Sequence, residues 1–332
     1  MQDVAKRANV SISTVSHVLN NTRRVENSTR ERILAAIEHL DYRPNLLARG
    51  LRGAGSKTIG LVISDIREEF FAVLTKVIES AAYERGYAVM LCDSEESPEK
   101  EAHYVELLAE RGADGIIISP VDSSSCPKPP QGRSLPIVQV DRRCAGAPYD
   151  FFGIDNGACA AEAVRHFASI GRRRLGFIGH ELSIMTMAER AEGFAVAMRE
   201  LGDSKGGLVL VLPSRGADAK SKVKRWFAAN PSLEGIVCGN ANICCSTLEA
   251  LDELGIDVPR GMGIVSFDDP TYFAFMRSPI TALRQPTDRM GLAALDSLLD
   301  LVSGEETGRG RERLMPVDLI VRKSCGAGEA RR

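Results

Sequence analysis

The feature that most constrains the fold of this 332-residue chain is a series of short apolar runs that begins near Thr58. The runs are Ile59–Ser64, Ala88–Cys92, Gly115–Ser119, Ile137–Val140, Leu175–Gly179, Leu208–Leu212, Gly235–Cys238 and Gly263–Phe267. Longer amphipathic stretches separate them, and strands that alternate with helices in this way predict parallel sheets covered on both faces. These strands are too many for a single sheet. We therefore expect two doubly wound lobes, with ligand bound at the carboxyl ends of their strands.

The chain before these runs predicts a small all-α unit. Apolar residues repeat at helical spacing over residues 2–8, and the turn-forming segment Asn9–Ser11 interrupts them. A second helix follows to about Asn20, with Ser11 as its expected N-cap. A third helix is expected to start at Ser28, where the capping-box spacing occurs. The glycine-rich segment 53–56 then predicts a flexible joint and the first domain boundary.

The charge of the chain is divided unevenly between these two parts. Residues 1–57 contain ten Lys and Arg against five Asp and Glu, a balance of +5, and the remainder has a balance of −7. A basic first part on an acidic body favours contact between that part and a polyanion.

Several other classes of protein lack support in the sequence. No apolar run reaches the roughly 18 residues that span a bilayer, and no apolar segment of a secretory signal is present, so we expect a cytoplasmic protein without a membrane partner. Phosphate-binding loops and the nucleophile elbow are missing, so no enzyme is indicated. None of the eight cysteines forms C-x-x-C, so we predict neither a metal nor another cofactor.

The segment Asp3–Asn20 resembles the helix-turn-helix of the lactose/galactose repressor family of bacterial transcription regulators. It fits the pattern D-V-A-x-x-A-x-V-S-x-S-T-V-S-x-V-L-N. Y-R-P-N at 42–45 and L-A-R-x-L-R at 47–52 continue the resemblance, which extends to about Cys325.

The resemblance implies a helix-turn-helix head with a hinge helix, followed by an α/β core similar to the periplasmic binding proteins. The head would comprise residues 1–57 and the core 58–325, followed by a tail at 326–332. Within the core, the first lobe would comprise 58–155 and 286–311, and the second lobe 156–285 and 312–325.

A recognition helix needs small or polar residues on its exposed face so that they reach base edges in the major groove. Ile12 and Ser13 begin the second helix, and we expect them to contribute most to base choice. Thr14 and Asn20 are better placed for phosphate contacts. The expected DNA-binding residues of this helix are Ser11, Ile12, Ser13, Thr14, Ser16, His17 and Asn20.

The resemblance also implies that the helix after Pro44 inserts Leu51 into the minor groove, while Arg49 contacts phosphates. The alternative is that Leu51 packs against the core. One head contacts too few base pairs for a specific site, so we expect a homodimer on a near-palindromic operator of double-stranded DNA.

In the core, the resemblance implies a small sugar-like effector between the lobes. Arginine, amide and carboxylate groups can hydrogen-bond its hydroxyls, and phenyl rings can pack against its apolar face. The alternative for each polar residue is an ordinary place in a loop. The expected effector-binding residues are Phe70, Phe71, Asp141, Arg190, Asn240 and Asp268.

One loop departs from the family pattern, because Arg67-Glu68-Glu69 replaces a polar residue followed by Asn-Pro. Two interpretations are open: a solvated loop, or a carboxylate of Glu68 or Glu69 that faces the cleft and favours a cationic ligand. The function expected from the whole sequence is a ligand-responsive repressor. The alternative is a small-molecule binding protein without a DNA function.

Overall fold

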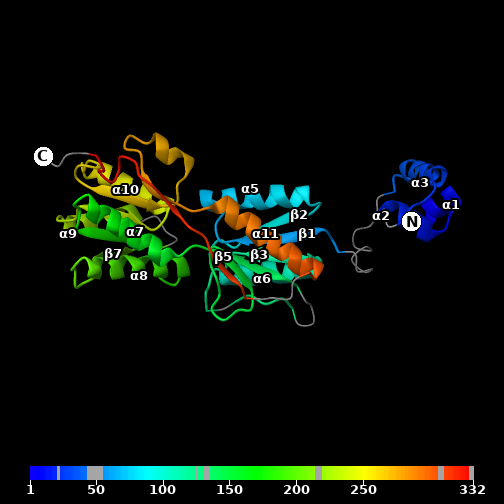
Figure 1. Cartoon of the computed structure of the whole chain (residues 1–332), viewed down its shortest axis with the longest axis horizontal. Coiled ribbons are helices and arrows are strands. Elements are labelled where there is room, and N and C mark those ends of the chain that lie inside the picture. The colour runs from blue at the N-terminus through cyan, green and yellow to red at the C-terminus, as the bar shows by residue number, and fades with distance from the viewer. Residues whose placement is uncertain are drawn as a thin grey trace. The chain divides into compact units, whose positions relative to one another are not determined.

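The computed structural model describes residues 1–20, 23–42, 55–124, 126–130, 135–213, 219–305 and 310–328. The chain divides into two compact units, Met1–Ser56 and Lys57–Arg332. Among the described residues, the first unit contains helices and no strand, and the second alternates strands and helices (Figure 1). Within the described ranges, no helix has both the length and the apolar character to cross a membrane.

The first unit consists of α1 (Gln2–Ala8), α2 (Ile12–Asn20) and α3 (Asn27–His39). Its core contains Val4, Val15 and Ile33, which are all completely buried. Burial at helical spacing explains why these segments fold together, since each helix alone is too short to be stable in water. The expected start of α3 at Ser28 was wrong by one residue: Glu26 is the N-cap, and its side chain makes no capping bond.

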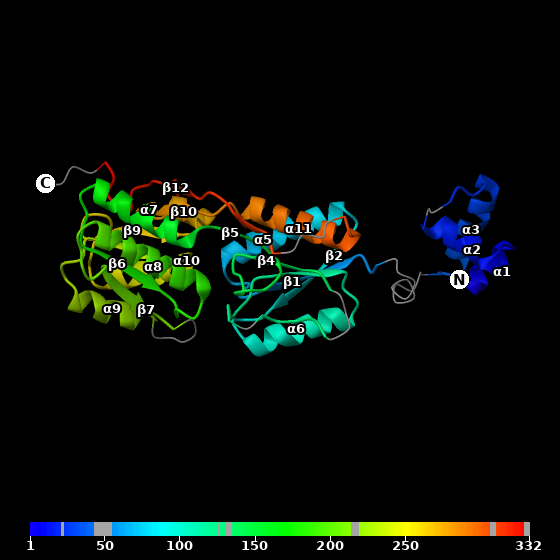
Figure 2. The ribbon, with the colours of Figure 1, turned by 60° about the horizontal axis from the view of Figure 1, so that its bottom comes forward.

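The first sheet of the second unit has the strand order β11-β5-β4-β3-β1-β2, with all pairs parallel. Helices α5 (Glu69–Glu84) and α11 (Thr287–Ser303) pack together on one face, and α6 (Pro98–Glu110) covers the other (Figure 2). The strands are β1 (Thr58–Ile63), β2 (Ala88–Asp93), β3 (Gly115–Ile118), β4 (Ile137–Val140), β5 (Asp150–Gly153) and β11 (Glu312–Leu314).

The second sheet has the order β12-β10-β9-β8-β6-β7, parallel except where β12 joins β10. Helices α7 (Asn156–Ser169) and α8 (Met185–Glu200) pack together, as do α9 (Ala219–Ala229) and α10 (Ala241–Glu253). The strands are β6 (Leu175–Gly179), β7 (Leu208–Val211), β8 (Gly235–Cys238), β9 (Gly263–Phe267), β10 (Thr281–Arg284) and β12 (Asp318–Ile320). Two doubly wound lobes confirm the expected fold class.

Along the described chain, three short segments connect the two sheets. They lie between β5 and α7, between β10 and α11, and between β11 and β12, at residues 154–155, 285–286 and 315–317. The expected assignment of Glu312–Leu314 to the second lobe was wrong, because this strand pairs with β5 of the first sheet. The bond from the amide of Met315 to the carbonyl of Gly153, 2.8 Å, extends that pairing to the start of the third connection.

Candidate DNA-binding face and interlobe cleft

The turn between α1 and α2 is held by local hydrogen bonds. Asn9 ends α1 in the left-handed region, with a φ of 53°, which asparagine tolerates better than most residues. Ser11 Oγ accepts a hydrogen bond from the amide of Thr14 at 3.1 Å, so the expected cap of α2 is present. A cap of this kind stabilises a helix by about 1 kcal/mol. The turn therefore fixes where α2 begins.

The face of α2 away from the core carries small and polar side chains. Val15 and Val18 are buried, whereas Ser11, Ile12 and Ser13 are exposed. Thr14, Ser16 and His17 are partly buried. Of the other expected DNA-binding residues, Asn20 is described only in its backbone, and Arg49 and Leu51 lie outside the described residues.

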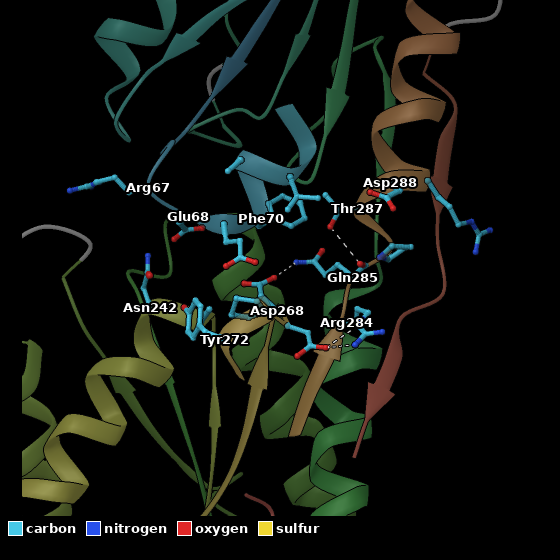
Figure 3. A pocket seen from close by; sticks show the side chains of 18 residues that line it. Arg67, Glu68, Phe70, Asn242, Asp268, Tyr272, Arg284, Gln285, Thr287 and Asp288 are labelled. Carbon is cyan, nitrogen blue, oxygen red and sulfur yellow. Dashed lines mark hydrogen bonds and ion pairs between the residues drawn. The ribbon is translucent and has the colours of Figure 1, made fainter. Parts of the chain in front are cut away.

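A cleft lies between the two lobes, at the carboxyl ends of their strands, and has two adjoining chambers. The inner chamber has a volume of about 290 Å³ and the outer chamber about 600 Å³. Together they reach the size typical of small-molecule sites. In Figure 3, Glu68 and Phe70 approach the outer chamber from the first lobe, and Asp268 and Tyr272 from the second. Four of the expected effector residues line the inner chamber with Phe70: Asp141, Arg190, Asn240 and Asp268.

Arg190 is fixed by a motif on α8. Its Nε donates to Asn156 Oδ1 at 2.8 Å, and its guanidinium lies 4.1 Å from the centre of the Phe267 ring. Three residues later, Gly193 lies so close to Gly157 of α7 that a side-chain Cβ would overlap the Gly157 backbone. The glycine thus allows α7 and α8 to approach, and this approach brings Arg190 to the cleft.

Asn240 connects the two lobes. Its side-chain oxygen accepts from the amide of Ile243 at 2.9 Å and so caps α10. The side-chain nitrogen of Asn240 donates to Glu68 Oε1, also at 2.9 Å. The amide therefore both starts a helix of the second lobe and binds a carboxyl group of the first.

The two neighbouring phenylalanines have different surroundings. Phe70 is partly exposed and lines both chambers. Phe71, on the inner face of α5, is 1% exposed and packs in the core. Successive residues of a helix point about 100° apart, so only one of the pair can face the cleft. The expectation that Phe71 walls the pocket does not fit this placement, and we exclude it from the site.

Sequence reasoning missed several residues of the inner chamber. Gln285 and His180 directly follow β10 and β6, and their position after a strand was a signal that could have found them. Glu96 and Arg142 form a two-bond ion pair, with both nitrogen-to-oxygen distances at 2.8 Å. Only the fold brings these two residues together, so no local signal in the sequence could have identified the pair.

Three carboxyl groups of the inner chamber, those of Glu68, Asp141 and Asp268, have raised pKa values. Burial raises the pKa of Glu68 to about 8, and repulsion from Asp268 adds to this effect. Burial also raises the pKa of Asp141 to about 6, although Arg142 and Arg190 oppose the shift. The pKa of Asp268 is raised for the same reason. At neutral pH Glu68 is therefore mostly protonated.

Comparison with known proteins covers both units. Residues 1–45 match the model of bacterial regulatory proteins, lacI family, and residues 164–325 match a periplasmic binding protein-like domain. The HTH-type transcriptional repressor PurR of Haemophilus influenzae (strain PittEE) is 30% identical over 331 residues, 98% of each chain. PurR of Klebsiella pneumoniae (strain 342) is 31% identical over 335 residues, 99% of this chain and 97% of its own.

Among solved structures, the Lac repressor dimer bound to operator and the anti-inducer ONPF has a similar fold. The TM-score is 0.83 at 23% identity, over 97% of this chain and 98% of that chain. The similarity therefore includes the helical unit as well as the two lobes.

Proposed function

Because the chain belongs to the lacI family of bacterial regulatory proteins, we propose that it represses transcription from an operator under the control of a ligand in its interlobe cleft. It is a ligand-responsive DNA-binding regulator and not an enzyme, since full-length relatives are transcriptional repressors. One observation carries the proposal: a single chain joins the exposed polar face of α2 to a buried polar cleft.

On the DNA side, α2 enters the major groove with Ile12 and Ser13 at the base edges. Ser11, Ser16 and His17 extend this contact, and Thr14 and Asn20 bind phosphates. Arg49 binds phosphate near the minor groove, where Leu51 wedges a base step. Two copies of the chain supply two heads for a near-palindromic operator, because one head offers few contacts of about 1–3 kcal/mol each.

On the ligand side, the effector occupies the inner chamber against Phe70, Asp141, Arg190, Asn240 and Asp268. These residues come from both lobes, so a bound effector favours one angle between the lobes over another. The effector changes operator affinity only as far as it prefers one of the two states.

The test is selection of bound duplexes from a random DNA library by the full-length protein at two salt concentrations. We expect enrichment of a palindrome with a flexible central step. The variant Ser13→Ala is expected to alter the selected half-site, and Tyr83→Ala, an exposed site in the second unit, is expected to leave it unchanged. Binding without any sequence preference would contradict the proposal and favour a small-molecule binding protein without a DNA function.

We also propose that the protein works in the cytoplasm, on the nucleoid that contains its operator. The match to relatives that are transcriptional repressors supports this location, because an operator is a segment of the chromosome. A fluorescent fusion that spreads evenly through the cell, and still does so after addition of operator plasmids, would contradict nucleoid association.

A further inference from the structure

The inner chamber contains more carboxyl groups than its arginines neutralise. Arg142 uses both terminal nitrogens for Glu96, and its Nε lies 3.6 Å from Asp141. Arg142 is thus shared between Glu96 and Asp141, so Glu68, Asp141 and Asp268 have only Arg190 and part of the charge of Arg142 as their cations among the described lining residues. His180 adds little positive charge, because burial lowers its pKa. Asp65 and Arg67 at the rim pair with each other at 2.5 Å.

Arg190 is already engaged by other groups. Besides Asn156, it donates to the carbonyl of Gly239 at 2.6 Å, and its guanidinium stacks on Phe267. A buried carboxyl group without a close cation is costly in its charged form, and such a group holds its proton instead. The raised pKa values of Glu68, Asp141 and Asp268 are the expected result.

The neutral side chain of Gln285 gives independent evidence that a hydrogen-bond donor is missing from the chamber. Gln285 is 8% exposed, and its Nε2 donates to Asp268 Oδ1 at 2.7 Å. Its oxygen Oε1 is buried and has no hydrogen-bond partner in the described part of the chain. Such an unpaired buried acceptor destabilises the protein until a donor reaches it. Arg142 Nε and His180 Nδ1 are also buried without a partner among the described residues, so the unpaired acceptor marks the part of the chamber beside Asp268. An ammonium group, with three donors and no acceptor, complements that part.

We propose that the effector of this protein carries a positively charged amine, and that Glu68 and Asp268 hold the ammonium group while the neighbouring polar groups bind hydroxyls, as in an amino sugar. The inference rests on the proposed function, which makes this cleft the effector site. A neutral sugar would bring no further positive charge to these three carboxyl groups, and an anionic ligand would be repelled by those that are ionised.

The proposal has a signature that a purely structural carboxyl group would not produce. With a pKa of about 8, Glu68 is mostly protonated at pH 7, and it becomes ionised when an ammonium group binds beside it. Binding at pH 7 therefore releases a proton, so the heat of binding depends on the ionisation heat of the buffer. The other charged or titratable side chains that line the inner chamber with Glu68 are Asp65, Arg67, Glu96, Asp141, Arg142, His180, Arg190 and Asp268.

The test is calorimetric titration of the full chain with D-glucosamine, D-galactosamine and D-mannosamine, each beside its parent hexose and its N-acetyl derivative. At least one amine is expected to bind about tenfold more tightly than its N-acetyl partner, as one charged hydrogen bond implies. Glu68→Gln is expected to abolish both this preference and the proton release. The matched control Glu79→Gln, which removes an exposed carboxylate from the same helix, is expected to change neither.

Asp268→Asn provides a second variant in case Glu68→Gln unfolds, and thermal unfolding of each variant checks its folding. Equal or tighter binding of the hexoses or N-acetyl derivatives would overturn the proposal, and so would binding of none of the amines or an unchanged preference in both variants. If the protein selects an operator but shows no preference for amines, only this inference fails. If it binds amines but selects no operator, the proposed DNA function fails.

Discussion

Asp141 and Asp268 occupy the same position in the two lobes. Asp141 directly follows β4 and Asp268 directly follows β9, and their φ angles of 65° and 64° are both left-handed. Each amide continues the sheet, from Asp141 to the carbonyl of Phe152 at 2.9 Å and from Asp268 to that of Leu283 at 3.1 Å. Each lobe thus ends a central strand with a sharp turn that points one carboxyl group at the cleft.

This backbone predicts a specific order of stability at position 141. Asp141→Ala is expected to unfold about 1 kcal/mol more easily than Asp141→Asn, because asparagine tolerates the left-handed region and alanine does not. Urea unfolding of both variants measures the difference. At Asp252, which is exposed on α10, the order is expected to reverse because alanine is the better helix former. Equal stabilities of the two variants at 141 would refute the prediction.

The complete burial of Ile33 in the core of the first unit predicts that this unit can be unfolded without unfolding the second. Ile33→Ala removes a completely buried side chain from a small core and is expected to cost about 2–5 kcal/mol. We expect loss of operator binding and of the unfolding transition of the first unit, while the transition of the second unit stays unchanged. Calorimetric unfolding measures both transitions. Leu34→Ala is the control, because Leu34 is 50% exposed on the same helix. A variant that still binds operator normally would contradict this expectation.

The place of His17 on α2 predicts that a substitution there changes the salt dependence of operator binding. His17→Arg adds a permanent charge to α2 and is expected to steepen the slope of log affinity against log salt by about 0.9, the effect of one added phosphate contact. Fluorescence anisotropy over a salt series measures the slope. Tyr83→Arg adds the same charge to an exposed site of the second unit and should leave the slope as it is. Equal changes of slope in both variants would contradict the prediction, because the added charge would then act regardless of its position.

The raised pKa of Glu68 predicts that the stability of the ligand-free protein falls as pH rises. Its pKa is about 8 in the folded protein and 4.5 as the ordinary value, so folding takes up a proton between these limits. The resulting stabilisation is present below pH 4.5 and is lost as pH rises through 8, at up to about 1.4 kcal/mol per pH unit. Urea unfolding from pH 5 to 8 should show a shallower decline in Glu68→Gln. Parallel curves for wild type and variant would exclude the effect.

The sequence predicted much of the fold because most strands are continuous apolar runs. β4, β6, β8 and β9 have the predicted bounds. β11 was missed because it is a short, exposed strand with polar residues, stabilised by its neighbour rather than by its own pattern.

The site was harder to predict. Asp141 and Arg190 lie in recognisable motifs, but the pairing of Arg142 with Glu96 depends on contacts distant in sequence. The contrast between Phe70 and Phe71 depends on the exact rotation of α5, which a resemblance does not specify.

Gln285 lies in one of the three short connections between the lobes, and its amide nitrogen is bonded to Asp268. Hinge motion is absorbed by a few residues at the ends of elements, and residues 285–286 form such a place. A ligand that competes with Gln285 for Asp268 would therefore act directly on a connection between the lobes, with no residue in between. One residue of this protein therefore belongs both to a connection between the lobes and to the lining of the cleft, so binding and any change in the angle between the lobes would share the same side chain.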